Sequence, residues 1–136
     1  MIVCLLAATK LMAADQARRI VIYDGVATEV SAPAETSKDL WVTMKDLKRA
    51  TKFVVKPQGV CRDQLCFPLP KARKAEFISK KGWFNLSEFA RLVKQPFAVD
   101  EKHGIWHFGP RSDAQNAHLE SLDAPDFALP DVNGKS

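Results

Sequence analysis

The sequence predicts an α+β fold, in which an antiparallel, hairpin-rich sheet packs with two short helices and precedes an extended C-terminal tail. Two observations lead to this prediction: a hairpin signal near the start of the chain, and an internal repeat that combines strands with a short helix. The length of 136 residues suits one domain of ordinary size. A content of 46% hydrophobic and 26% charged residues is typical of a globular chain.

The first predicted element is a β-hairpin. Residues 18–23 form a run rich in β-branched side chains, and residues 26–30 return as a second strand. Asp24-Gly25 between them is a two-residue turn signal, because both residue types tolerate a positive φ. Residues 31–37 contain Pro33 and are predicted to form a loop.

The internal repeat supplies the helices. Residues 41–52 resemble residues 83–94, and each copy starts with a tryptophan. An N-cap residue follows, Thr43 in the first copy and Asn85 in the second, with an acid three positions later that can reach back to the cap backbone. The apolar residues after each cap recur at helical spacing, so each copy predicts one short amphipathic helix.

Each predicted helix leads into strands. In the first copy these are residues 53–55 and, after a turn, 65–67; in the second copy they are 96–99 and 105–108. The unit is therefore strand, helix, strand, turn, strand, used twice. Because one short repeat cannot bury its apolar face alone, we expect the two copies to share one core.

Seven aromatic side chains lie in or next to the repeat. We expect them in the core, because large aromatic residues at repeat-related positions usually pack there. The alternative is that they line a ligand cleft. They are Trp41, Trp83, Trp106, Phe84, Phe89, Phe97 and Phe108.

Charge is unevenly spread along the chain, whose formal net charge is +4. Residues 38–81 hold twelve Lys/Arg against four Asp/Glu, whereas residues 100–136 hold three against seven. This split favours an acidic partner or a neighbouring module over a membrane surface, with a solvated basic face as the simpler alternative. Nucleic acid is not expected, because the basic run lacks interleaved aromatics apart from Phe77. The residues expected to meet an acidic protein partner are Lys71, Arg73, Lys74, Lys80 and Lys81.

Residues 1–14 resemble a truncated secretory signal segment. The run is apolar except for Thr9 and Lys10, and small residues follow at Ala13 and Ala14. The positive start of a signal is missing, and the alternative is a buried first strand or helix. The run is too short to predict a membrane span. The signal interpretation implies an extracytoplasmic protein, in the periplasm, secreted or in the cell envelope.

Two cysteines remain after the signal segment, which contains Cys4. Cys61 and Cys66 are close enough to bridge across a turn, and a structural disulfide is the first interpretation. Closing so small a loop stabilises a domain by about 2 kcal/mol. The second interpretation is a regulatory or substrate dithiol for an attached redox domain, since the neighbouring Arg62 favours a thiolate.

A metal site is a third interpretation of the cysteines. His103 and His107 would complete a set of two cysteines and two histidines with Cys61 and Cys66. We do not favour it, because a whole repeat separates the two pairs and the histidines are predicted in a turn and in a strand.

No residue of this chain is predicted to be catalytic, and no cofactor is expected. The sequence lacks a nucleophile elbow, a zincin helix and a dinucleotide fingerprint. Gly134-Lys135-Ser136 mimics the end of a phosphate loop, but Leu129 occupies the required upstream glycine position.

The arrangement over residues 19–109 resembles the copper amine oxidase N-terminal-like domain. The resemblance rests on the opening hairpin through Pro33 and on the aromatic-led helices with their trailing hairpins. It implies a spacer or binding domain of exported proteins and, despite the family name, no copper site. The chain departs from that pattern in the loop of Cys61 and Cys66 and in the basic stretch 71–81.

Residues 110–123 are polar and are predicted to be a linker, with a short helix as the alternative. Residues 124–136 resemble the opening of a redoxin domain, the thioredoxin-fold family of peroxiredoxins and thiol–disulfide oxidoreductases. The matching residues are 124–127, Leu129, Asp131 and Gly134-Lys135, and the family's active-site cysteine would lie beyond Ser136.

Together the two resemblances imply a non-catalytic extracytoplasmic accessory module at the N-terminus of a redoxin-type oxidoreductase or peroxidase. The alternative is an independent exported cell-envelope module, with a binding or structural role and a structural disulfide.

Overall fold

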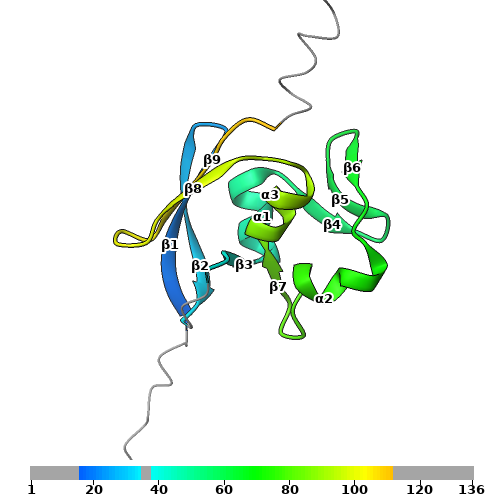
Figure 1. Ribbon diagram of the computed structural model, residues 1–136, viewed down its shortest axis with the longest axis horizontal. Coiled ribbons are helices and arrows are strands. Elements are labelled where there is room, and N and C mark those ends of the chain that lie inside the picture. The colour runs from blue at the N-terminus through cyan, green and yellow to red at the C-terminus, as the bar shows by residue number, and fades with distance from the viewer. Residues whose placement is uncertain (1–15, 35–37, 112–136) are drawn as a thin grey trace, which may run out of the picture.

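The computed structural model describes residues 16–34 and 38–111, which form an α+β domain with mostly antiparallel strands. The predicted fold class is confirmed. Three sheets surround two central helices, and a third short helix lies at the edge (Figure 1). The predicted signal segment, Cys4, most of the predicted linker and the redoxin-like residues 124–136 lie outside the described residues.

The first sheet joins the beginning of the described chain to its end. Its strand order is β2 (Val26–Pro33), β1 (Gln16–Tyr23), β9 (Ile105–Phe108) and β8 (Phe97–Asp100). Strands β1 and β9 pair in parallel, whereas the other pairs are antiparallel. The parallel pair brings the opening hairpin against the last hairpin, so neither can form its full set of hydrogen bonds without the other.

The predicted opening hairpin is confirmed, and its turn residues Asp24 and Gly25 have φ of 49° and 76°. Positive φ at both positions is the type I′ geometry that matches the twist of the flanking strands. The prediction of a loop from residue 31 is wrong in part, because β2 continues through Pro33. Proline is tolerated there because β2 is an edge strand and Pro33 is its last residue.

The repeat is present in the structure. Strand β3 (Trp41–Thr43) leads into helix α1 (Met44–Thr51), and strand β7 (Trp83–Asn85) leads into helix α3 (Leu86–Leu92). Strands β3 and β7 pair antiparallel with each other, which places the two copies side by side. The helices then bury the predicted faces, with Leu47 and Ala50 of α1 and Phe89 and Ala90 of α3 in the core.

Both predicted N-caps are made. The Thr43 hydroxyl accepts from the Asp46 amide at 3.1 Å, and the Asn85 side-chain oxygen accepts from the Glu88 amide at 2.9 Å. The carboxylates of Asp46 and Glu88 were expected to accept from the backbone amides of the cap residues, but they make other contacts. The Asp46 carboxylate accepts from the backbone amide of Ser31 at 2.9 Å, and Glu88 pairs with Arg91 at 2.8 Å.

The hairpin predicted for the first copy, from residues 53–55 and 65–67, is wrong. Strand β4 (Val54–Lys56) does not pair with β6 (Leu65–Phe67), because β5 (Gly59–Arg62) lies between them and pairs with both. The short strand β5 begins with glycine and contains an arginine and a cysteine, so its pattern did not predict a strand.

A further short helix was also not predicted. The 3₁₀ turn η1 (Lys71–Arg73) runs into helix α2 (Lys74–Phe77) within the basic stretch. Phe77 is fully buried and anchors this helix to the core. The basic stretch is therefore an ordered part of the domain with one apolar anchor.

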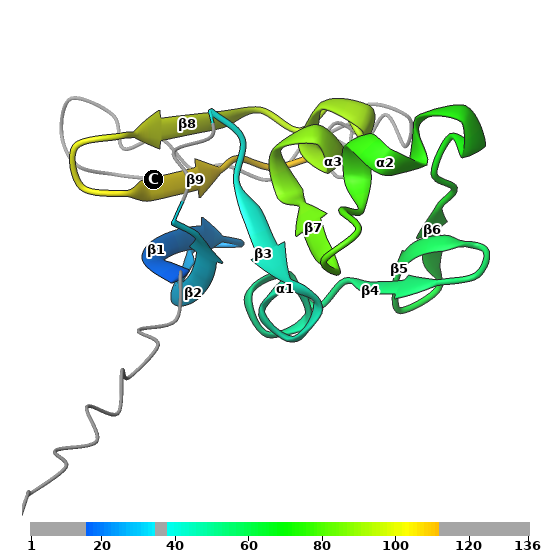
Figure 2. The ribbon, with the colours of Figure 1, turned by 90° about the horizontal axis from the view of Figure 1, so that it is seen from below.

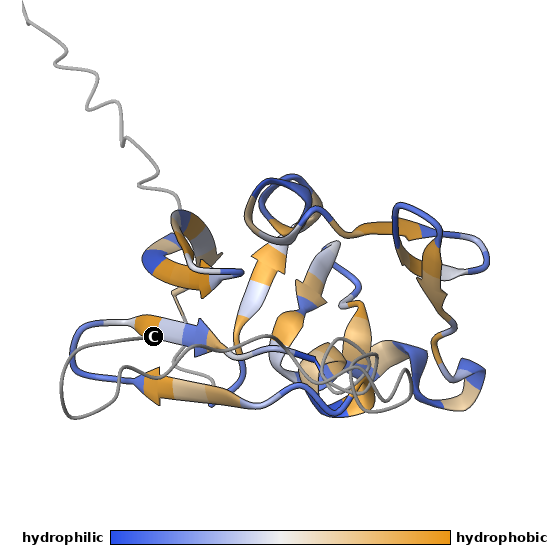
Figure 3. Cartoon of the chain, turned by 90° about the horizontal axis from the view of Figure 1, so that it is seen from above, coloured by the Kyte–Doolittle hydropathy of each residue, from blue (hydrophilic) through white to orange (hydrophobic). Residues whose placement is uncertain are grey.

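The core contains seven buried aromatic residues among mostly aliphatic ones. The four-stranded sheet, the β3–β7 ribbon and the helices, whose arrangement Figure 2 shows, enclose it. Phe89 of α3 contacts Phe53, Phe67 and Phe84 with ring centroids 5.3–5.8 Å apart. Phe67 brings the third sheet into this cluster. Hydrophilic residues concentrate in the turns and on the outer side of α1 (Figure 3). In the described part of the chain, no helix has the length and apolarity needed to cross a membrane.

Gly59 gives a test of the third sheet. Its φ is 146°, and a Cβ there would lie 2.2 Å from the carbonyl oxygen of Phe67. We therefore expect Gly59→Ala to lower the free energy of unfolding by about 3 kcal/mol, measured by urea denaturation. Gly82→Ala is the matched control, because Gly82 has φ of 82° and no heavy atom within 4 Å of its added Cβ. The control should lose only about 1 kcal/mol, and equal losses would contradict this packing.

Candidate functional site

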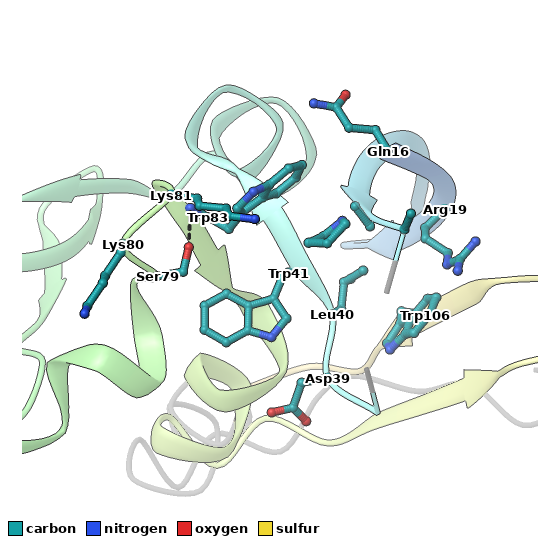
Figure 4. A pocket seen from close by; sticks show the side chains of 13 residues that line it. Gln16, Arg19, Asp39, Leu40, Trp41, Ser79, Lys80, Lys81, Trp83 and Trp106 are labelled. Carbon is teal, nitrogen blue, oxygen red and sulfur yellow. Dashed lines mark hydrogen bonds between the residues drawn. The ribbon is translucent and has the colours of Figure 1, made fainter. Parts of the chain in front are cut away.

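The candidate site is a groove of about 710 Å³ between the edge of the first sheet and the β3–β7 ribbon (Figure 4). This volume is within the range of ligand sites, roughly 300–1,000 Å³. All three tryptophans of the chain line it. The lining residues are Gln16, Arg19, Ala32, Pro33, Ala34, Asp39, Leu40, Trp41, Ser79, Lys80, Lys81, Trp83 and Trp106.

Strand alternation places Trp41 and Trp83 in the groove. In the β3–β7 register Val42 is opposite Phe84, and both side chains are buried in the core. Successive side chains point to opposite faces of a strand, so Trp41 and Trp83 lie on the other face. Trp41 is opposite Asn85 and Trp83 opposite Thr43, which makes the tryptophans diagonal neighbours within reach of each other.

The expectation that all seven aromatic residues belong to the core is therefore wrong in part. Phe84, Phe89, Phe108 and Trp106 are buried, as expected. Trp41 and Trp83 are half-buried and belong to the groove wall, and Phe97 packs at the edge of the core. The cleft alternative was the better interpretation for the two repeat tryptophans.

Trp106 forms the opposite wall. It comes from β9, where it pairs with Val21 of β1 and Val99 of β8, and it is 6% exposed. Its indole Nε1 is buried and has no hydrogen-bond partner among the described residues. A buried donor without an acceptor costs about 1–3 kcal/mol, so this nitrogen lowers the stability of the fold locally.

Cations lie at both ends of the groove. Arg19 lies next to Trp106, and Lys80 and Lys81 lie toward Trp41 and Trp83 (Figure 4). Within residues 16–34 and 38–111, none of the three cations forms an ion pair with a carboxylate. Among the described residues, no acid therefore compensates their positive charge.

The one carboxylate of the lining, Asp39, is already engaged. Arg91 donates to its Oδ1 at 2.7 Å, and the Asn85 amide donates to its Oδ2 at 3.0 Å. The hydrogen bond from Arg91 is the main cause that holds the Asp39 pKa below its ordinary value. Asp39 thus stays ionised but is compensated by Arg91, so the described residues of the groove carry an excess of positive charge.

Backbone contacts fix the floor of the groove to helix α3. The amide of Leu40 donates to the Ser87 hydroxyl at 2.9 Å, and the Leu86 amide donates to the Leu40 carbonyl at 2.9 Å. Leu40 itself is 1% exposed. The segment that carries Asp39 and Trp41 is therefore held in place before any ligand arrives.

The groove offers many donors and few acceptors. Its tryptophan, lysine and arginine side chains only donate hydrogen bonds. Among the side-chain acceptors, the Asp39 oxygens are engaged and the Ser79 hydroxyl accepts from the Trp83 amide at 3.0 Å. The amide oxygen of Gln16 is a further acceptor in the lining. A complementary ligand must therefore bring acceptors, negative charge and a surface that stacks on indole rings.

The two cysteines lie outside the groove. Cys61 of β5 and Cys66 of β6 are directly opposite each other and form a disulfide, with Cα atoms 4.0 Å apart. Such a short separation is typical of a non-hydrogen-bonded antiparallel pair, where side chains approach most closely. Cys61 is 1% exposed and Cys66 is exposed. The bridge therefore joins a core position to the surface of the third sheet.

The two histidines of the metal-site interpretation lie away from the cysteines. His103 lies in the β8–β9 turn, with its Nδ1 2.7 Å from Asp100, and His107 is exposed on β9. Nowhere in the described ranges do three or more His, Cys, Asp or Glu side chains group as metal ligands. The structure does not bring Cys61, Cys66, His103 and His107 together.

The five predicted partner-binding cations fall into different settings. Lys80 and Lys81 belong to the groove wall, whereas Lys71 and Lys74 are exposed on η1 and α2. Arg73 is engaged inside the domain, because it pairs with Glu76 at 2.6 Å and also with Glu88. Sequence reasoning missed Arg19, which comes to the groove from β1. The alternation of apolar residues in each repeat strand was the signal that could have placed the tryptophans.

Comparison with protein-family models, curated proteins and solved structures finds no match to this chain. The resemblances to the copper amine oxidase N-terminal-like domain and to the redoxin family therefore remain predictions.

The contact of Asp39 with Arg91 predicts a pH effect on stability. Because the folded-state pKa of Asp39 is lowered, its contribution is complete above the ordinary value of 3.8 and is lost as pH falls through the folded value. Asp39→Asn should therefore be less stable than the wild type at pH 6, and the difference should disappear in strong acid. Urea denaturation over this pH range measures it, and a difference that grows on acidification would contradict the assignment.

Proposed function

We propose that this chain is a non-catalytic extracytoplasmic accessory module that precedes a redoxin-type thiol–disulfide oxidoreductase or peroxidase domain and binds a partner for it. The observation that carries the proposal is the tryptophan groove. Two half-buried indoles and three cations that have no carboxylate partner among the described residues form a surface suited to recognition.

The disulfide supports the extracytoplasmic part of the proposal. Disulfides persist in oxidising compartments and are rare in the cytosol of most organisms. Cys61 lies in the core and its partner across the strand pair lies at the surface, so the bridge fixes the outer strand β6 to the domain. This is the geometry of a stabilising bridge in a small domain, in agreement with the signal-like character of residues 1–14.

The redoxin part of the proposal rests on the sequence of residues 124–136. A redoxin domain that starts there would place its active-site cysteine after Ser136, outside this chain. The resemblance of residues 19–109 to the copper amine oxidase N-terminal-like domain agrees with a binding or spacer role for the part before it. An independent cell-envelope module with the same disulfide is the second candidate, because the described core is closed by its own first and last strands.

Sequencing of the gene beyond the Ser136 codon tests the fusion. We expect a thioredoxin-like continuation with an active-site cysteine. A stop codon directly after Ser136 would refute the fusion and favour the independent module.

The disulfide gives a functional test in the full-length protein. The Cys61→Ala/Cys66→Ala variant should lose about 2 kcal/mol of stability but keep its turnover of a small disulfide or peroxide substrate. Thermal denaturation and a steady-state assay measure the two effects. If turnover is abolished while the variant remains folded, the pair acts as a redox dithiol and the chain is not a non-catalytic accessory.

A further inference from the structure

We infer that the tryptophan groove recognises an extended, acidic, proline-containing peptide segment of a partner protein. This inference rests on the proposed binding role and names the chemistry of the partner. It is argued from three properties of the groove: the charge at its ends, the stacking faces between them, and the excess of hydrogen-bond donors.

The charge of the groove selects an anion. Arg19 is at one end and Lys80 and Lys81 at the other, and none has a carboxylate partner within the described residues. Asp39, the lining acid, is compensated by Arg91 at 2.7 Å. Carboxylates spaced along a ligand would therefore meet a cation at each end of the groove.

The aromatic faces select rings or other flat apolar groups. Trp41 and Trp83 lie diagonally on one ribbon face, and Leu40 lies between Trp41 and Trp106 in the view of Figure 4. Aromatic-lined grooves bind polyproline II segments, because the proline rings pack on the aromatic faces and the conformation is already formed before binding. Pro33 and the flanking alanines add further apolar surface to the wall.

The hydrogen-bond donors and acceptors of the groove favour a peptide ligand over a sugar. A polyproline II segment has no internal hydrogen bonds, so its carbonyls are free to accept, and its prolines carry no N–H donor. Such carbonyls suit the lysine and arginine donors of the groove lining. A sugar hydroxyl, by contrast, also needs an acceptor for its own proton. The lining side chains offer fewer acceptors than donors: the amide oxygen of Gln16 and the remaining lone pairs of Asp39 and Ser79, whose oxygens already accept other hydrogen bonds. The groove is therefore better matched to proline-containing peptide than to acidic oligosaccharide.

Calorimetric titration of the full chain with synthetic peptides tests this inference. The probe is a peptide of three Glu-Pro-Pro repeats. Three Lys-Pro-Pro repeats control for charge, three Glu-Gly-Gly repeats control for the proline rings, and trigalacturonate represents an acidic sugar. We expect saturable binding of the Glu-Pro-Pro peptide, which weakens as salt is added, and at least tenfold weaker binding of every other probe.

Variants locate the binding. Trp41→Ala and Trp83→Ala should each weaken the affinity about tenfold, as for buried aromatic anchors. Lys80→Gln/Lys81→Gln should weaken it and reduce its dependence on salt. Lys71→Gln/Lys74→Gln is the matched control, because it removes the same charge from exposed positions outside the groove lining. The control should change the affinity less than twofold.

Five results would overturn the inference. These are equal binding of the Lys-Pro-Pro peptide, equal binding of the Glu-Gly-Gly peptide, tighter binding of trigalacturonate, equal effects of the two double-lysine variants, and no binding of the Glu-Pro-Pro peptide. The lysine variants change exposed side chains and keep the core intact, so they decide the matter even if a tryptophan variant fails to fold. The accessory role itself is judged separately, by the gene beyond Ser136 and by turnover of the disulfide variant.

Discussion

The antiparallel pairing of β3 with β7 is the constraint on which the rest of this structure depends. Three residues from each repeat copy form this ribbon, with Val42 opposite Phe84. The pairing sends these two side chains into the core and their tryptophan neighbours to the opposite face. A shift of the register by one residue would exchange the two sets, burying Trp41 and Trp83 and exposing the core residues. Core and groove are therefore specified by the same three-residue strands.

The two copies of the repeat begin with the same pattern of residues, but their helix starts contact different parts of the domain. In the first copy the Asp46 carboxylate ties α1 to β2 through the Ser31 amide. In the second copy the cap residue Asn85 reaches Asp39, and Ser87 binds the Leu40 amide, so α3 holds the floor of the groove. Residues at the start of each helix thus cap the helix and also hold neighbouring segments: β2 in the first copy and residues 39–40 in the second. This explains how a small domain keeps an ordered, half-polar groove beside its core.

Sequence patterns predicted the parts of this fold that depend on local chemistry. The Asp24-Gly25 turn, both N-caps and the helical faces follow from residue types a few positions apart. The parallel pair of β1 with β9 and the insertion of β5 depend on contacts between distant segments, which periodicity does not report. The groove appeared in the sequence only as the less favoured cleft alternative, and Arg19 was missed, because Arg19, Trp41 and Trp106 come from three strands that only the tertiary fold brings together. The cysteine pair was found because a cross-strand bridge needs only a short hairpin.

The central claim is that Trp41 and Trp83 face an electropositive groove while Trp106 is buried. Quenching of tryptophan fluorescence by iodide and by caesium tests it most directly. Because Lys80 and Lys81 attract anions, the ratio of iodide to caesium quenching should exceed the ratio for free N-acetyltryptophanamide, and this excess should fall in Lys80→Gln/Lys81→Gln but persist in Lys71→Gln/Lys74→Gln. A ratio no higher than that of the free amide in the wild-type protein, or the same excess in both variants, would contradict the account.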